Sequence, residues 1–128
     1  MIVDTSAIVA ILFQEPDASL YAEAIAGAEE CRISAATLVE ASIVVASQTE
    51  NGWSELDYFM RRAGFSVSPV TEEVARIALE AWWRYGKGRH AAGLNFGDCF
   101  SYALSRATGE PLLFKGMDFS KTDLPSVL

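Results

Sequence analysis

Short apolar runs alternate with helix-like segments along the whole chain, and this alternation restricts the fold more than any other feature of the sequence. The runs suited to strands lie at residues 2–4, 31–34, 65–70 and 112–114, and residues 124–128 could add an edge strand. Between them, helical spacing or capping residues predict helices after the turn at 15–17 and over residues 7–13, 36–48, 54–63, 71–85 and 96–108. Strands that alternate with helices form βα units around a mostly parallel sheet. We therefore expect a three-layer α/β/α domain with a mostly parallel central sheet of four or five strands.

The length and composition indicate one domain without a membrane segment. A chain of 128 residues buries roughly two-thirds of its unfolded surface, which is enough for one core, so we expect a single domain over residues 1–128. Its longest apolar runs fall far below the roughly 20 residues that cross a bilayer. The N-terminus has no basic region or cleavage site of a signal peptide. We expect a cytoplasmic protein in which Cys31 and Cys99 are buried free thiols.

Four carboxylates from separated segments need an explanation. Asp4 ends the first predicted strand, Asp98 enters a helix after a loop, and Asp118 follows the last strand. Taken singly, Asp4 and Asp98 are well explained as helix caps. Glu40 differs, because its helix is apolar almost all round and is expected to be buried. A buried carboxylate needs a partner cation, which is either an arginine from elsewhere in the chain or a metal ion.

Taken together, the four carboxylates favour a site for a hard cation. Mg²⁺ and Mn²⁺ prefer oxygen ligands, keep several waters and use few direct carboxylates. Such an ion suits chemistry at phosphorus, because it activates water and stabilises the attacking and leaving oxygens. No competing catalytic set is present, since the only histidine, His90, has no nucleophile beside it. We therefore predict Asp4, Glu40, Asp98 and Asp118 as metal ligands.

The formal charge of −7 is unusual for a protein that binds nucleic acid. If the four carboxylates bind metal, more than half of this charge is accounted for. The basic residues cluster in one loop, with Arg84, Lys87 and Arg89 shortly before Asp98. We expect these three cations to contact a substrate backbone, and the alternative is an ordinary surface loop.

The arrangement resembles the PIN domain and, within that family, the VapC-like toxins of prokaryotic toxin–antitoxin pairs. The resemblance covers essentially the whole chain and rests on residues 1–7 (MIVDTSA), 39–41 (VEA), 93–100 (GLNFGDCF) and 112–119 (LLFKGMDF), with Thr122 and Asp123 after them. It implies that Asp4, Glu40, Asp98 and Asp118 form the family's catalytic acidic quartet. It also implies that Thr5 or Ser6 is the small polar residue that supports the first aspartate. Met117 departs from the pattern, which has a polar residue there, and we interpret Asp123 as a turn residue.

The resemblance implies a function as well as a site. It implies an endoribonuclease, dependent on Mg²⁺ or Mn²⁺, that cleaves RNA phosphodiester bonds as the toxin of a toxin–antitoxin pair. It also implies a cognate antitoxin that blocks the site and a homodimer. Trp82, Trp83 and Tyr85 on one helix fit either a dimer surface or core packing.

Three other functions fit parts of the sequence. A phospho-accepting receiver-like domain would explain Lys115 after a strand, but its acceptor aspartate should end the middle strand, and residues 65–70 contain no acid. A catalytically inactive PIN fold could act as a binding module, although the presence of all four acids argues against it. A nuclease of the same chemistry that acts on DNA or a structured flap would need added recognition elements. The endoribonuclease is therefore the preferred interpretation.

Overall fold

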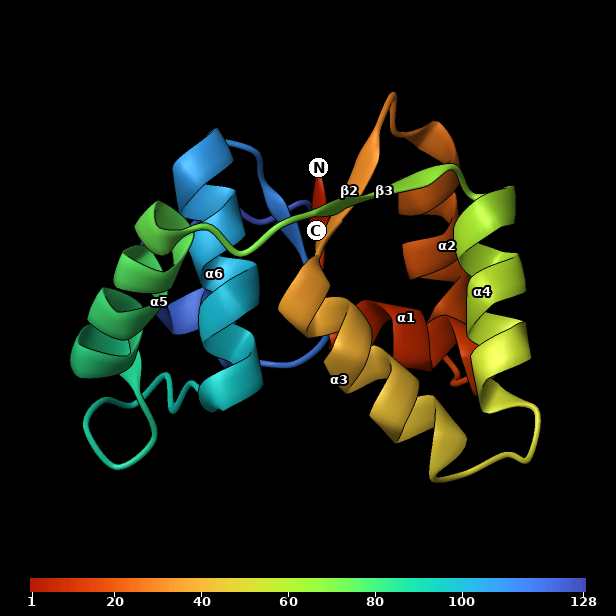
Figure 1. Cartoon of the computed structure of the whole chain (residues 1–128), viewed down its shortest axis with the longest axis horizontal. Coiled ribbons are helices and arrows are strands. Elements are labelled where there is room, and N and C mark those ends of the chain that lie inside the picture. Colours follow the sequence, from red (N-terminus) through yellow and green to blue (C-terminus); the bar gives the residue numbers. More distant parts are fainter.

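The computed structural model describes residues 1–128 and has a four-stranded parallel sheet with the order β3-β2-β1-β4. The elements follow one another as β1 (Ile2–Val3), α1 (Thr5–Leu12), α2 (Ala18–Gly27), β2 (Cys31–Ser34), α3 (Ala35–Ala46), α4 (Gly52–Arg62), β3 (Phe65–Ser68), α5 (Glu72–Tyr85), α6 (Phe96–Thr108), β4 (Leu112–Leu113) and η1 (Phe119–Lys121). Figure 1 shows the helices on both sides of the strands. The predicted α/β/α fold is therefore confirmed.

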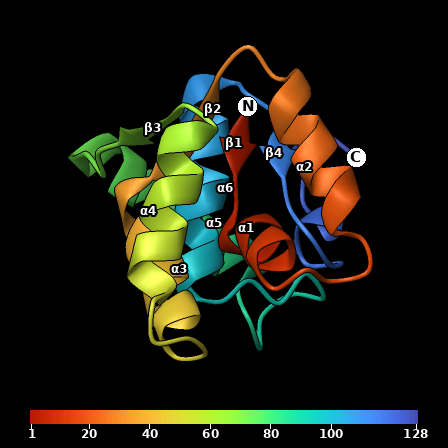
Figure 2. The same ribbon diagram turned by 90° about the vertical axis from the view of Figure 1, so that its right-hand side faces the viewer.

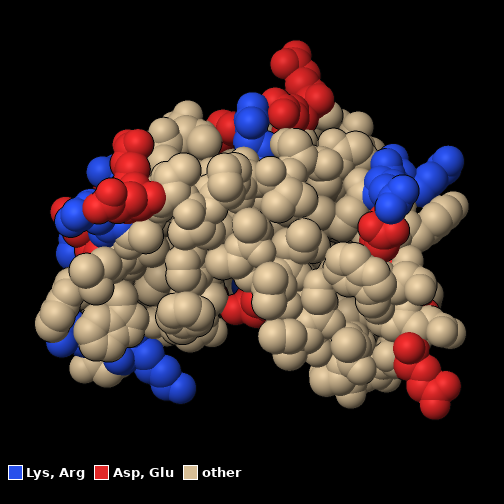
Figure 3. Space-filling model, viewed as in Figure 1, with Lys and Arg blue, Asp and Glu red and all other residues tan.

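The sheet separates two hydrophobic clusters. Adjacent strand residues point to opposite faces, so Ile2 and Leu112 pack with α5 and α6, whereas Val3 and Leu113 pack with α1, α2 and α4. Figure 2 views the strands from the side of α2 and α4. The two groups of helices form two lobes, and Figure 3 shows a notch between them with acidic atoms at its floor.

The carboxyl ends of the parallel strands lie at one edge of the sheet, where α1 and α3 begin directly after β1 and β2. Asp4 caps α1 by accepting a hydrogen bond from the backbone N–H of Ser6, and Ser34 caps α3 in the same way. Helix α1 therefore starts at Thr5. The helix predicted over residues 7–13 is present but begins two residues earlier, because Asp4 caps it.

Two predictions of helix burial are wrong at particular positions. In α2 the spacing of Leu20, Ala24, Ile25 and Ala28 predicts an apolar stripe. Ala24, Ile25 and Ala28 do pack against the core, but Leu20 is exposed, and Tyr21 is buried next to it. Helix α3 is not buried all round, because Val39 and Ile43 are 58% and 65% exposed. Its buried face consists of Thr37, Ala41 and Val45, which recur every four residues. An apolar composition therefore did not show how many sides of α3 are covered.

Two further predictions concern the cysteines and the C-terminal segment. Cys31 and Cys99 are buried and free, as expected. The predicted edge strand at residues 124–128 is reduced to one parallel bridge between Leu112 and Ser126, next to Pro125, which has no N–H to extend the pairing. No helix combines the length and the apolar character needed to span a membrane.

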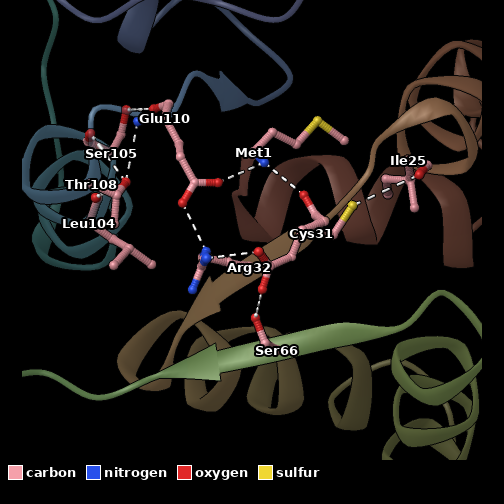
Figure 4. A network of polar contacts seen from close by, with 10 residues as sticks. Met1, Ile25, Cys31, Arg32, Ser66, Leu104, Ser105, Thr108 and Glu110 are labelled. Carbon is pink, nitrogen blue, oxygen red and sulfur yellow. Dashed lines mark hydrogen bonds and ion pairs between the residues drawn. The ribbon is translucent and has the colours of Figure 1, made fainter.

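The amino ends of the strands are joined by ion pairs (Figure 4). Arg32 of β2 lies 2.8 Å from Glu110 and 2.7 Å from Glu30. The other carboxylate oxygen of Glu110 lies 2.8 Å from the terminal ammonium group of Met1, and Ser66 of β3 donates to Glu30. This network holds the edge of the sheet opposite the carboxyl ends, so the candidate site described next is separate from it.

Candidate active site

Asp4 is the most firmly held carboxylate at the carboxyl edge of the sheet. It is buried, and its Oδ2 accepts hydrogen bonds from the backbone N–H and the hydroxyl of Ser6 at 3.0 and 2.7 Å. Its Oδ1 accepts from the Ser101 hydroxyl of α6 at 2.6 Å. Of the two predicted supporting residues, Ser6 thus contacts Asp4, while the Thr5 hydroxyl donates to the carbonyl oxygen of Thr37. Three donors therefore fix the orientation of this side chain without any cation.

Asp98 lies in the first turn of α6 and takes part in a reciprocal cap. Its carboxylate accepts from the N–H of Asn95 at 2.9 Å, and the Asn95 side chain accepts from the N–H of Asp98 at 2.9 Å. Burial raises the pKa of Asp98 to about 7 despite the hydrogen bond from Asn95, and the charges of Asp4, Asp118 and Glu40 act in the same direction as burial. Capping therefore explains the place of Asp98 in its helix, but it does not neutralise its charge.

Glu40 extends from α3 toward the start of α6. Burial raises the pKa of its carboxyl group, a contact with the Thr5 hydroxyl opposes this, and the charge of Asp4 adds to it. The side chain is only partly buried, because the neighbouring face of α3 is exposed. No arginine or lysine forms an ion pair with it. Of the two partners that the sequence left open for Glu40, the arginine is therefore ruled out.

Asp118 is exposed and lies immediately before η1, in the segment that follows β4. Its negative charge is one of the smaller contributions that raise the pKa of Asp98. The segment is anchored by the N–H of Lys115, which donates to the Ser6 hydroxyl at 3.0 Å. The ammonium group of Lys115 pairs with Glu15 and Asp17 and not with the acidic quartet.

The donor chemistry of the acidic quartet fits a hard divalent cation. All its donors are carboxylate oxygens, and none of the four side chains is paired with a lysine or arginine. No three acidic, histidine or cysteine side chains are close enough together to hold one ion. Mg²⁺ characteristically takes one or two carboxylates and keeps several waters, so the residues present suit a water-rich site of this kind.

The predicted substrate contacts Arg84, Lys87 and Arg89 are all exposed, at the end of α5 and in the loop after it. Arg84 donates to the Tyr85 hydroxyl, and the Arg89 guanidinium lies 4.2 Å from the ring centroid of Trp83. The ammonium group of Lys87 has no hydrogen bond or ion pair within the protein. Lys87 is therefore the member of the set whose charge is available to a ligand without breaking an internal contact.

Asp123 lies outside the acidic quartet. It accepts a hydrogen bond from Tyr102 at 2.7 Å and lies 3.4 Å and 3.9 Å from the guanidinium groups of Arg106 and Arg84, so its partners come from α6 and α5. These contacts support its interpretation as a structural residue of the C-terminal segment.

Sequence reasoning missed three polar residues of the site: Asn95, Thr37 and Ser101. A pattern for Asn95 was present, because Asn95 and Asp98 have the spacing of a capping box. Thr37 and Ser101 lie three residues from Glu40 and Asp98 respectively, a spacing that places side chains on the same face of a helix. Nothing in the sequence indicated that these two hydroxyl groups meet.

Comparison with known proteins gives consistent matches along nearly the whole chain. Residues 1–124 match the model of the PIN domain. Ribonuclease VapC of Mycolicibacterium smegmatis is 49% identical and covers 99% of both chains. Ribonuclease VapC28 of Mycobacterium tuberculosis is 52% identical over all of this chain and 98% of its own length.

Solved structures show the same fold at low sequence identity. VapC20 of Mycobacterium tuberculosis, a toxin that cleaves the sarcin-ricin loop, has a TM-score of 0.77 at 20% identity, over 98% of this chain and 97% of its own. A toxin–antitoxin complex from Klebsiella pneumoniae has a TM-score of 0.70 at 14% identity, over 95% and 92% of the two chains.

Proposed function

Because the chain belongs to the PIN-domain family, and within it to the VapC ribonucleases, we propose that it is a metal-dependent endoribonuclease and the toxin of a toxin–antitoxin pair. The observation that supports this most directly is the acidic quartet itself. The charges of the other three carboxylates all raise the pKa of Asp98, and no lysine or arginine forms an ion pair with any of the four. A structural role alone would not favour keeping these charges together.

We assign the binding of Mg²⁺ or Mn²⁺ to Asp4, Glu40, Asp98 and Asp118, some directly and the others through water. When bound, such an ion activates water for attack on phosphorus and stabilises the oxygens that gain charge. Asp4 offers a carboxylate already oriented by Ser6 and Ser101. Asp98, whose pKa burial raises to about 7, would have to lose its proton to serve as a ligand, so ion binding should release protons near neutral pH.

The proposed substrate is RNA, and the proposed location is the cytoplasm, where RNA and an antitoxin would both be present. Arg84, Lys87 and Arg89 would contact the phosphate backbone, and Lys87 is the best placed because its charge is unpaired. The relatives at about 50% identity bear the name ribonuclease, which supports cleavage of RNA over cleavage of DNA. A cognate antitoxin is proposed because structural neighbours were solved as toxin–antitoxin complexes.

A homodimer is proposed through an exposed surface that we call the apolar face. It consists of large hydrophobic side chains of α3, α5 and α6, namely Val39, Ile43, Leu79, Trp82, Trp83 and Phe96. Two cavities of about 320 and 240 Å³ open on this face and share Phe96 and Phe100 in their walls. Contiguous exposed apolar surface of this kind is unusual on a monomer and typical of interfaces.

The proposed function is tested by incubating the purified protein with total RNA in EDTA, Mg²⁺ or Mn²⁺. We expect cleavage only with the ion, and loss of cleavage in Asp98→Asn. The matched control is Asp57→Asn, which removes one acid from the surface of α4 and should cleave normally. Equal cleavage by the wild type and Asp98→Asn would contradict the assignment of the site.

The toxin role is tested separately in cells. Expression of the wild type should arrest growth, and co-expression of the small open reading frame next to its gene should relieve the arrest. If the wild type and Asp98→Asn are equally harmless at high expression, the toxin proposal fails.

A further inference from the structure

Buried hydroxyl groups connect the three elements that hold Asp4, Glu40 and Asp98. Thr37 Oγ1 of α3 lies 3.1 Å from Ser101 Oγ of α6, and Ser101 Oγ lies 2.6 Å from Asp4 Oδ1. The exposed fractions of Thr37, Ser101 and Asp4 are 1%, 0% and 3%. Polar groups buried this completely are expected to be paired with one another, and here they are.

The donors and acceptors in this chain can be assigned. A carboxylate oxygen only accepts hydrogen bonds, so the single hydroxyl proton of Ser101 is directed to Asp4. Thr37 must then be the donor in its contact with Ser101. Because Ser6 occupies the other oxygen of Asp4, both oxygens are held, and the carboxylate cannot rotate without breaking a buried hydrogen bond.

The positions of the two hydroxyl groups on their helices are informative. Thr37 lies three residues before Glu40 on α3, and Ser101 lies three residues after Asp98 on α6. Residues three apart share a helix face, so each hydroxyl lies on the face of its helix that bears a carboxylate of the acidic quartet. The contact between Thr37 and Ser101 therefore sets the position of the two helices relative to each other and to Asp4.

We propose that Ser101 is a positioning residue, itself oriented by Thr37, that holds the Asp4 carboxylate in register with Glu40 and Asp98 for binding a divalent cation. This inference rests on the proposed function, because it requires that the acidic quartet binds an ion. Hydrogen-bond partners of metal ligands typically change metal affinity by about 10- to 100-fold when they are removed.

The first test measures Mn²⁺ binding to the full chain by calorimetry, without RNA. Ser101→Ala should bind Mn²⁺ about 10- to 100-fold more weakly than the wild type. The matched control is Ser105→Ala, because Ser105 lies one turn further along α6, is 2% exposed, and donates an equally short 2.6 Å hydrogen bond to the Glu110 carbonyl. Ser105→Ala should lower the melting temperature as well but leave the Mn²⁺ affinity unchanged.

The second test distinguishes the effect of the Thr37 hydroxyl group on Mn²⁺ affinity from the effect of its side-chain packing. It does not depend on whether Ser101→Ala folds. Thr37→Val keeps the shape and removes the donor, so its Mn²⁺ affinity should fall. Thr37→Ser keeps the donor and removes a methyl group, so it should bind Mn²⁺ like the wild type although it is less stable. A packing role predicts the opposite order for the two variants.

The outcomes distinguish this inference from the proposed function. If the wild type binds Mn²⁺ but Ser101→Ala or Thr37→Val binds it equally well, the positioning role is overturned and the metal site stands. If the wild type binds no Mn²⁺, the metal-dependent function is overturned, and the positioning role with it.

Discussion

Gly97 and Glu40 lie so close together that a side chain at position 97 would occupy the place of the Glu40 carboxylate. A β-carbon built on Gly97 would be 1.4 Å from Glu40 Oε2 and 2.5 Å from its Cδ. The backbone of Gly97 is ordinary helix at the start of α6, so glycine is needed here for space and not for an unusual conformation. The first turn of α6 can thus lie directly against the acidic side chain of α3.

This contact predicts that Gly97→Ala reduces activity without unfolding the protein. Glu40 is the flexible end of a partly buried side chain and can move aside, and alanine is favoured over glycine in helices by about 1 kcal/mol. Displacing a catalytic group by about 1 Å can lower a rate about 100-fold. We therefore expect a near-normal melting temperature and a large loss of RNA cleavage.

The control for this variant is Gly27→Ala in α2, where a β-carbon would meet nothing within 4 Å. It should retain full cleavage. A Gly97→Ala protein that is as active as the wild type would show that the position of Glu40 does not matter for the reaction.

Replacement of Asp98 by Asn should change stability in opposite directions with and without the ion. In EDTA the variant should melt at or above the wild type, because it removes one of several mutually repelling carboxylates. With Mn²⁺ at a hundredfold excess over its Kd, a protein that binds it only when folded gains about 2.7 kcal/mol, so the wild type should then melt higher. A wild-type melting temperature that is the same in EDTA and in Mn²⁺ would contradict the metal site.

The pH dependence of stability should report on the same carboxylate. The pKa of Asp98 is raised from 3.8 to about 7, so the folded state holds this proton more tightly than the unfolded state. The protonated carboxyl group therefore contributes to the free energy of unfolding at low pH. This contribution falls as the pH rises through this range and is absent above about pH 7. In EDTA, the melting temperature of Asp98→Asn minus that of the wild type should be larger at about pH 8 than at about pH 5. A difference that is constant with pH would show that Asp98 has an ordinary pKa.

Lys87→Ala should weaken RNA binding and flatten its salt dependence. Each phosphate contact on a single strand contributes about 0.7 to the slope of log K against log salt, so one contact less should lower the slope by about that amount. Arg62→Ala is the control, because it removes one exposed cation from α4 in the other lobe. Equal slopes for Lys87→Ala and the wild type would show that Lys87 does not contact the RNA backbone.

Ile43→Asp should convert a dimer to a monomer if the apolar face is the dimer interface. Ile43 is exposed on α3, so a charge there is tolerated in the monomer but is strongly unfavourable once covered. Leu20→Asp is the control, because Leu20 is similarly exposed on α2 and lies outside the apolar face. Light scattering should show a monomer for the first variant and a dimer for the second, and a dimer in both cases would place the interface elsewhere.

The local features of the fold were predictable because they depend on neighbouring residues. The strand at Cys31–Ser34 and helix α5, which Thr71 caps, agree with the predicted strand at residues 31–34 and helix at residues 71–85. Gly64, which has a φ of +69°, follows α4 as a left-handed glycine should. Capping was also right for Asp4 and Asp98, although it did not exclude a second role, since a carboxylate can accept a helix N–H and still face an ion.

The tertiary structure alone decided which side chains meet across the carboxyl edge of the sheet. Composition suggested that α3 is buried all round, but packing against α1, α4 and α6 covers only part of it, so Ile43 is exposed and Glu40 is partly so. The contacts of Ser101 with Asp4 and of Gly97 with Glu40 join residues 97 and 57 positions apart. Periodicity and capping act over one or two helical turns, whereas these contacts depend on how α3, α6 and β1 pack together. The sequence therefore determined which residues are acidic and at which element ends they lie, and only the packing of the helices on the sheet decided how each is oriented.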